Sequence, residues 1–421
     1  MAELQLSGYD ESLLNGDRGD GARLSMEILV RYAQALGAQQ LIPVTSAHVD
    51  SCLYIGESSL AFARLLTLAG ASVSVPTTLN VGAVDLLHPH LNRGDPARIR
   101  GGQELMRLYE TMGCRPTWTC APYQLPGRPK LGEHVAWAES NAIVFINSVV
   151  GARTDRYGDF IDICAAVTGR VPDLGLHRTE NRRGQDVFDV SGVSNQWSRS
   201  ELFWPVLGLL VGWEAGARIP VITGVHEPPS DDQLKAFGAA AASAGSVAMF
   251  HLVGTTPEAP TVGDALQGHL PLRTVDVSDA DLRIAATRIT SLHRGKLAAV
   301  SIGTPHFSGL EFAQLVDEIA GRRCHPDVEF YVSTGRAVLQ ELERTETLRE
   351  LREFGAEVLV DTCTYVTPVI QARDGVVMTN SAKWAYYAPG NLGVTVVLGS
   401  LADCVSSAVS GEIVTVLPSG E

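Results

Sequence analysis

Two Thr-Cys pairs, Thr119-Cys120 and Thr362-Cys363, end closely similar segments of the chain. In each segment a helix-patterned run stops at a glycine, and a short extended stretch leads into the pair. A third such segment ends on Thr77-Thr78-Leu79-Asn80 and lacks the thiol. Open α/β sheets bind ligands at the carboxyl ends of their strands, so we expect the two thiols to meet at such an edge. Three ordinary helix–strand units with incidental threonine and cysteine fit the same spacing equally well.

The cysteines favour a metal over a disulfide framework. There are seven of them, an odd number, and no Cys-x-x-Cys motif, so thioredoxin-like chemistry and common zinc ribbons are not expected. The N-terminus lacks the basic and apolar regions of a signal peptide, which predicts a cytoplasmic protein with reduced thiols. Three thiolates brought together by folding could hold an iron–sulfur cluster with one open iron, a Lewis acid for a hydroxyl leaving group.

Composition narrows the function further. Apolar residues make up 45% and charged residues 19% of the 421 residues, which suits two or three globular α/β domains. The net charge of −14 disfavours nucleic acid and anionic membranes, because both need a basic surface. The sequence has no Gly-x-Gly-x-x-Gly dinucleotide motif, no Walker phosphate loop and no Gly-x-Ser-x-Gly hydrolase elbow.

Two histidines follow predicted strands and are candidates for the site. His306 comes after the strand predicted over 297–302, next to Ser308, which has capping-box spacing to Glu311. The helix cap explains Ser308 but not His306, so His306 is the better site candidate. His48 follows the strand predicted over 41–44, where a polar turn that caps the next helix is an equal alternative.

Other polar loops carry weaker signals. Ser148 and Arg153 follow a strand predicted over 142–146 and suit carboxylate binding, although a loop arginine is commonly just solvated. His88 and His90 form a His-x-His pair in a predicted loop over 81–100, where metal binding competes with ordinary solvation. Arg182 and Arg183 are expected to face solvent.

Periodicity predicts an alternation of helices and strands. We expect an N-terminal α/β domain over residues 1–215 and a C-terminal α/β region over 216–421, with a further break near residue 330. The apolar stretch 202–225 is interrupted by charges and prolines and is predicted to be buried core. Helices are expected over 10–40 (with a loop at 15–21), 62–69, 105–112, 160–168, 232–244, 280–293, 342–354 and 402–411, and further strands over 72–75, 115–118, 219–225, 247–253, 328–332, 358–360 and 394–398.

Spaced motifs over nearly the whole chain together resemble the aconitase X family. The motifs are Pro76-Thr-Thr-Leu-Asn80, Thr119-Cys-Ala-Pro-Tyr123, Trp137-Ala-Glu-Ser-Asn-Ala142 with Asn147-Ser-Val-Val-Gly-Ala-Arg153, Thr168-Gly-Arg-Val-Pro172, Pro305-His-Phe-Ser308, Asp361-Thr-Cys363 and Asn380-Ser-Ala-Lys383. The resemblance implies the aconitase-superfamily core, in which several three-layer α/β domains surround a central cleft. It also implies a hydro-lyase reaction.

The same resemblance implies a ligand set for an iron–sulfur cluster, [2Fe-2S] or [4Fe-4S], made of Cys120, Cys363 and Cys404. From the residues alone, Cys404 fits a buried helix cysteine equally well, and Cys52 is a fourth possible ligand. The remaining cysteines, Cys114, Cys164 and Cys324, are expected to be structural.

Two activities are implied by the family. Bacterial members dehydrate cis-3-hydroxy-L-proline to Δ1-pyrroline-2-carboxylate, and archaeal members dehydrate (R)-5-phosphomevalonate. The stretch 47–54 is more similar to the bacterial branch, so we expect the hydroxyproline substrate. The expected site residues are His306, His48 and Lys383 as catalytic groups and Thr78, Asn80, Ser148 and Arg153 as substrate-binding groups.

Some family members fuse a swivelling domain with the serine base to the large part, and this chain resembles the large part alone. We therefore expect a separate small swivelling-domain subunit as partner, with no nucleic-acid or membrane partner. Two alternatives stay open: a non-catalytic metal- or ligand-binding protein on the same scaffold, and a zinc-dependent lyase that uses His88, His90 or His306.

Overall fold

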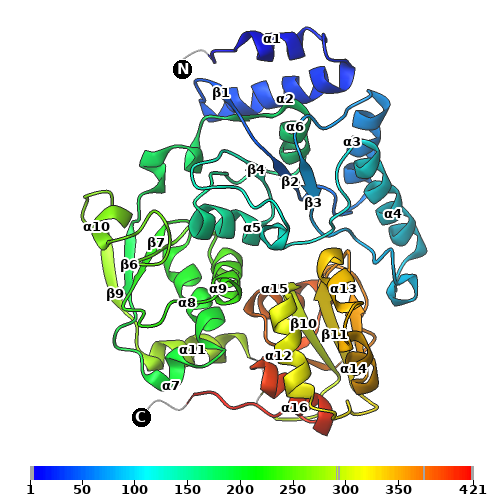
Figure 1. Ribbon diagram of the computed structural model, residues 1–421, viewed down its shortest axis with the longest axis vertical. Coiled ribbons are helices and arrows are strands. Elements are labelled where there is room, and N and C mark those ends of the chain that lie inside the picture. The colour runs from blue at the N-terminus through cyan, green and yellow to red at the C-terminus, as the bar shows by residue number, and fades with distance from the viewer. Residues whose placement is uncertain (1–3, 291, 293, 373–374, 419–421) are drawn as a thin grey trace.

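The computed structural model describes residues 4–290, 292, 294–372 and 375–418. Helices and mostly parallel sheets form three α/β parts that follow one another along the chain (Figure 1). This confirms the predicted fold class. Within the described ranges, no helix combines the length and apolar character that a membrane crossing requires.

The first part carries a parallel sheet in the order β3-β2-β4 and a small antiparallel pair, β1 with β5. Its strands are β1 (Leu41–Pro43), β2 (Ala47–Val49), β3 (Thr77–Leu79), β4 (Ala136–Trp137) and β5 (Arg170–Pro172). Its helices are α1 (Gly8–Leu14), α2 (Asp20–Leu36), α3 (Glu57–Leu68), α4 (Pro96–Thr111), α5 (Ser140–Phe145) and α6 (Ile161–Thr168).

The second part is built on a four-stranded parallel sheet in the order β8-β7-β6-β9. Its elements are β6 (Asp186–Asp189), α7 (Asn195–Ser198), α8 (Phe203–Ala215), β7 (Pro220–Thr223), α9 (Asp231–Ala244), β8 (His251–Leu252), α10 (Val262–Ala265), β9 (Arg273–Asp276) and α11 (Asp279–Ile289). Helix α8 is buried along most of its length, which confirms the core prediction for that part of the apolar stretch 202–225. The division after residue 215 stays a prediction, although β6 lies before it and pairs with β7 after it.

The third part holds a five-stranded parallel sheet in the order β12-β11-β10-β13-β14. Its elements are β10 (Ala299–Phe307), α12 (Gly309–Ile319), β11 (Glu329–Thr334), α13 (Arg336–Leu342), α14 (Thr347–Phe354), β12 (Ala356–Leu359), β13 (Val376–Thr379), α15 (Ala382–Leu392), β14 (Thr395–Leu398) and α16 (Leu401–Ser410). The predicted helix over 342–354 is therefore interrupted between α13 and α14.

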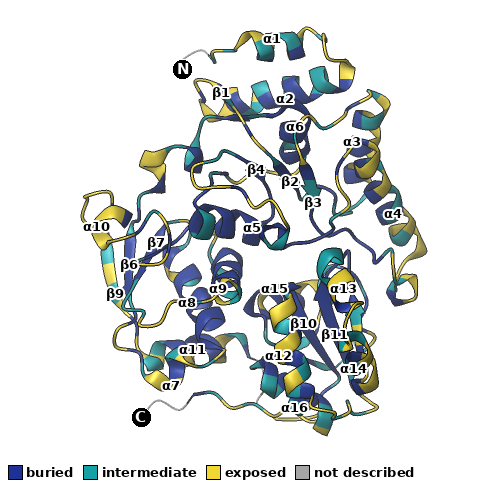
Figure 2. Ribbon diagram, viewed as in Figure 1, coloured by how far each residue is buried: buried dark blue, intermediate teal, exposed yellow. Residues whose placement is uncertain are grey.

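Helices cover both faces of this sheet. Successive residues of a strand point to opposite sides, so neighbours along one strand pack in different cores. Val300 and Met378 pack in one hydrophobic core with residues of α12, α14 and α16. Their neighbours Ala299 and Val377 pack in another core with residues of α15, α8 and α9. The central strand β10 is accordingly buried throughout and its neighbours along most of their length, while the helices show exposed outer faces (Figure 2). The sheet is thus held rigidly from both sides.

Local sequence signals at the helix ends behave as predicted. Gly355 closes α14 in the left-handed conformation that glycine takes without steric cost. Ser278 with Asp281, and Ser308 with Glu311, form capping boxes at the starts of α11 and α12. The strand β10 runs on through His306 to Phe307, further than the predicted 297–302.

Four predictions in the first part were wrong. The segment predicted as a strand over 142–146 is the helix α5, which a π-helical turn extends over Ile146–Val150. It is buried on all sides, so its apolar run carries no helical period that sequence could show. The strand predicted over 72–75 lies instead at Thr77–Leu79, and 115–118 contributes only an isolated bridge from Arg115 to Thr78. The predicted loop 81–100 ends early, because Asp95 caps α4 with Pro96 at its first position.

The expectation that Arg182 faces solvent was also wrong. Its side chain is fully buried and pairs with Glu258 at 2.6 Å. It also donates to the side-chain and backbone oxygens of Asn147 and to the backbone oxygen of Leu176. Arg182 therefore ties the second part to the π-helical turn of the first part.

Candidate metal centre

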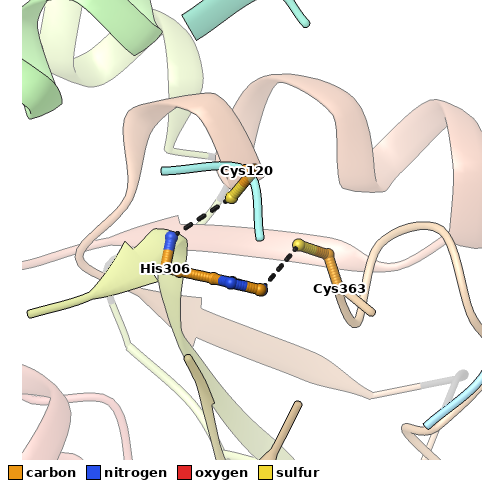
Figure 3. A group of neighbouring side chains, drawn as sticks. All are labelled: Cys120, His306 and Cys363. Atoms are coloured by element: carbon orange, nitrogen blue, oxygen red, sulfur yellow. Dashed lines mark hydrogen bonds between the residues drawn. The ribbon is translucent and has the colours of Figure 1, made fainter. Parts of the chain in front are cut away.

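Two cysteines and a histidine meet between the first and third parts. Cys120 follows the segment that pairs with β3, His306 lies near the end of β10, and Cys363 follows β12. A ligand atom from each lies within 4.8 Å of the others, and all three side chains are buried (Figure 3). Among the described residues, it is the one place where three or more potential metal ligands come together. The two Thr-Cys segments therefore do meet, as predicted.

A strap of hydrogen bonds fixes the loop that carries Cys363. Asp361 adopts a left-handed φ of 64°, and Arg336 holds its carboxylate through two hydrogen bonds of 2.6 and 2.7 Å. The backbone N–H of Leu86 donates to the same carboxylate at 3.1 Å. In return, Asp85 of the first part accepts a hydrogen bond from Val360 N at 3.0 Å. These reciprocal contacts bring Cys363 against the first part.

The two thiols differ in how readily each one loses its proton. Burial favours the neutral thiol, but the hydrogen bond from Cys363, the charge of Lys383 and the backbone N–H of His306 outweigh it and lower the pKa of Cys120. The His306 N–H lies 3.3 Å from Cys120 Sγ. The same Cys120–Cys363 contact, together with burial, raises the pKa of Cys363. Cys120 is thus the first of the pair to become a thiolate, the form that binds metal.

His306 is a neutral imidazole in this setting. Burial lowers the pKa of His306 to about 4, with the charges of Lys235 and Lys383 acting in the same direction. Its Nδ1 lies 3.1 Å from Thr119 Oγ1, and its Nε2 lies 3.7 Å from Cys363 Sγ. Neutral imidazole and thiolate are both common ligands of iron and zinc. The donor set therefore fits a metal centre.

The ends of three parallel strands line the space beside this group. Asn80 follows β3, Asp50 follows β2 and Glu139 follows β4, so all three lie at one edge of the sheet. Asn80 donates through its amide nitrogen to Asp50. Burial and the nearby charge of Glu139 raise the pKa of Asp50 to about 7. A carboxyl group with a pKa near 7 can accept or release a proton at neutral pH.

Lys383 joins the third part to this edge. It lies in the first turn of α15 and forms a buried ion pair with Glu139. Burial alone disfavours the ammonium, but the charge of Glu139 reverses this and raises the pKa of Lys383 well above its usual value. Lys383 also lines a cavity of about 560 Å³ between α9, α12 and α15. The cavity therefore reaches the edge of the site.

The structure places the other four predicted site residues in two different regions. His48 and Thr78 lie on the neighbouring strands β2 and β3, with His48 Nδ1 2.8 Å from Thr78 Oγ1. Ser148 and Arg153 are not brought to the thiols. Ser148 accepts a hydrogen bond from Phe250 N, while Arg153 donates to His177 O and Thr179 Oγ1.

The structure also does not bring Cys404 into the group. Its side chain is buried in the apolar core between α16 and the sheet of the third part. Cys52 lies in the core of the first part, with its sulfur 3.3 Å from Val49 O. The His88–His90 pair is likewise outside the group, and His88 Nδ1 lies 3.0 Å from Asp85.

Sequence reasoning missed Asp50 and Glu139 as site residues, although both were visible in polar runs. Asp50 comes directly after β2, a strand that the sequence analysis did not predict, since it expected a polar loop after the strand that proved to be β1. Glu139 comes directly after Ala138, which follows β4, a two-residue strand that no periodicity could reveal. Correct strand ends were the signal that would have found them.

Comparison with known proteins agrees with this geometry. Family models for the first, second and third domains of aconitase X match residues 3–180, 184–286 and 297–410. The crystal structure of Thermococcus kodakaraensis aconitase X in its holo form superposes with a TM-score of 0.86 at 31% identity, covering 96% of this chain and 100% of that one.

Named relatives extend the comparison. The chain is 43% identical to a cis-3-hydroxy-L-proline dehydratase of Pseudomonas aeruginosa, covering 98% of this chain and 71% of the relative. It is 41% identical to the enzyme of that name from Hypocrea jecorina, covering 99% and 70%. It is 32% identical to the phosphomevalonate dehydratase large subunit of Methanosarcina mazei, covering 97% and 98%. The chain belongs to the aconitase X family.

Proposed function

We propose that this chain is the catalytic part of a dehydratase that converts cis-3-hydroxy-L-proline to Δ1-pyrroline-2-carboxylate and water. The observation that carries the proposal is the buried Cys120–His306–Cys363 group beside the carboxylate edge of the first sheet. The identities of 43% and 41% to relatives with that name, against 32% to a phosphomevalonate dehydratase large subunit, support this substrate.

The reaction removes the elements of water across two ring carbons. The Cα–H and C3–O bonds break, and the electron pair of the Cα–H bond forms the C2–C3 double bond of an enamine. The proton and the hydroxide leave as water. Transfer of the nitrogen proton to C3 then gives the C=N bond of the product.

We propose an iron–sulfur cluster as the cofactor, held by Cys120 and Cys363. When bound, such a cluster supplies a Lewis acid for the hydroxyl leaving group. The neutral His306 ring lies close enough to complete or support that ligand set. Lys383 keeps a fixed positive charge at the site edge and is placed to hold the substrate carboxylate. His48, predicted as a proton donor, is buried on β2, and burial lowers its pKa to about 3, so its neutral ring is proposed to hydrogen-bond near the leaving group.

A zinc centre is the second candidate. Two cysteines and one histidine are the protein ligands of a known class of catalytic zinc site, and this chain assembles that set. Metal and sulfide analysis of anaerobically purified protein separates the candidates. Iron with acid-labile sulfide supports the cluster, whereas zinc without sulfide supports the alternative.

We propose a small swivelling-domain subunit, with a serine base, as the partner, since several relatives are named large subunits. We also propose that the protein works in the cytoplasm. All seven cysteines are free thiols, a state that a reducing compartment preserves.

The deciding experiment measures water loss from both family substrates. The chain and its small partner are co-expressed, and cis-3-hydroxy-L-proline and phosphomevalonate are assayed side by side. We expect turnover of the first only. Cys120→Ser and Cys363→Ser should each lose iron and at least about 100-fold in activity. Cys324→Ser, at a half-buried thiol bonded to Val328 O, is the matched control and should retain both. Full activity in both site variants would contradict the proposal.

A further inference from the structure

The carboxylate edge of the first sheet has an unbalanced charge. Glu139 has a cationic partner in Lys383, whereas the ion pairs of the described chain give Asp50 none. The hydrogen-bond donor to the Asp50 side chain is the amide of Asn80. Asp50 is also partly exposed, although it lies deep enough that burial perturbs its ionisation. A recessed carboxylate without a counter-charge favours a cationic ligand.

Asn80 supplies a second sign of a ligand. Its side chain is only 3% exposed, and its amide oxygen has no hydrogen-bond partner. Buried polar atoms nearly always have a partner, so an orphaned acceptor marks a place for an N–H or O–H donor. The nitrogen of the same amide group contacts Asp50, so the orphaned oxygen and the Asp50 carboxylate are neighbours.

The backbone holds the two acceptors together. Asn80 N donates to Val49 O at 2.9 Å, which fixes the ends of β3 and β2 side by side. The backbone N–H groups of Asp50 and Ser51 both donate to the buried carboxylate of Asp162, at 2.7 and 2.9 Å. The loop that presents Asp50 is therefore preorganised before any ligand arrives.

Building on the proposed function, we infer that Asp50 and Asn80 form the subsite for the secondary ammonium of the substrate. A secondary ammonium carries two N–H donors, and the subsite offers two acceptors, the Asp50 carboxylate and the Asn80 amide oxygen. A phosphorylated hydroxy acid carries only negative charge, so the same carboxylate repels it. The subsite thus selects cyclic amino acids over phosphorylated substrates.

The test compares two ligands that differ only at the ring nitrogen. The first is cis-3-hydroxy-L-proline, and the second is its ring-oxygen analogue, a 3-hydroxytetrahydrofuran-2-carboxylate. Both are measured with the metal-loaded, partner-bound wild type and with Asp50→Asn. We expect Asp50→Asn to weaken binding of the amine about 10- to 150-fold and to leave the ether analogue nearly unchanged. Asp276→Asn, at an exposed strand residue of the second part, is the matched control and should change neither.

Two further measurements keep the result decisive. Thermal melting and iron content show whether Asp50→Asn folds and loads, and Asp50→Glu, which keeps the charge, should retain most of the preference for the amine. Equal affinity of wild type and Asp50→Asn for the amine, with turnover intact, overturns the subsite alone. A wild type that turns over no hydroxyproline overturns the proposed function, and the subsite with it.

Discussion

At the residue scale, the buried Lys383–Glu139 ion pair has an energetic consequence that can be measured. Both side chains are nearly fully buried, at 3% and 6% exposure, and they come from different parts of the molecule. Removing one partner of such a pair leaves an uncompensated buried charge, which is costlier than removing both.

Lys383→Met should therefore destabilise the protein by about 3–5 kcal/mol at pH 8. The double variant Lys383→Met/Glu139→Gln should recover at least about half of that loss, because no buried charge is left without a partner. Urea unfolding of the single and double variants provides the measurement. A double variant as unstable as Lys383→Met would show that packing, rather than charge, sets the cost.

Glu311 gives a pH-dependent prediction. It pairs with the buried Lys235 of α9, yet burial raises its pKa from 4.5 to about 7. Because the folded-state pKa is the higher one, ionisation opposes folding, and the stability from this group is lost as pH rises from about 4.5 to about 7. The free energy of unfolding of Glu311→Gln should therefore rise by about 2 kcal/mol relative to that of the wild type as the pH goes from 5 to 8. Melting curves of both proteins across that range check it, and a constant difference would contradict it.

At the element scale, the loop after β12 positions the metal group. Asp361 combines a left-handed backbone with a carboxylate that binds Arg336 and Leu86 N, so two separate costs can be measured there. Asp361→Gly loses the carboxylate only, whereas Asp361→Ala also has to adopt a conformation that L-residues disfavour.

We expect both Asp361 variants to lose about 3 kcal/mol, since Arg336 is left without its partner, and the alanine variant to lose about 1 kcal/mol more. Both should also bind less iron, because Cys363 lies two residues further along the chain. Chemical unfolding and iron analysis are the readouts. Normal iron content in both variants would show that the strap does not position Cys363.

The same elements show what sequence reasoning can reach. Helix stops at Gly355, capping boxes at Ser308 and the meeting of Cys120 with Cys363 follow from local signals and from the geometry of parallel sheets. Helix α5 and the two-residue strand β4 could not be predicted in this way. A fully buried run has no period, and a short strand has too few residues to show one. The burial of Arg182 depends on Glu258, 76 residues away, and no local pattern encodes such a contact.

At the scale of the whole molecule, the candidate metal centre lies where the parts of the chain contact one another. Lys235 of the second part pairs with Glu311 of the third, and Asp85 of the first holds Val360 of the third. The candidate metal ligands come from the first and third parts, so relative movement of the parts would separate them. The three parts therefore form one functional unit.

Turnover should depend on a further protein. We expect the isolated chain to bind iron but to show no measurable dehydration, because the proposed base lies on the small subunit. Adding the purified small subunit should restore activity in proportion to complex formation, measured by titration and size-exclusion chromatography. Full activity of the isolated chain would place the base among its own residues, with Asp50 the first to test.

The separation of the ligands along the chain bears on how the protein is made. Cys120 and His306 are 186 residues apart, and Cys363 lies beyond both. A ribosome that has released the first 290 residues has exposed Cys120 without its two companions. Insertion of the proposed cluster would then have to wait until the last third of the polypeptide has emerged and folded. Until that moment Cys120 is unshielded, and its pKa is lowered only when Cys363, Lys383 and His306 reach it, so the thiolate and its companions arise together.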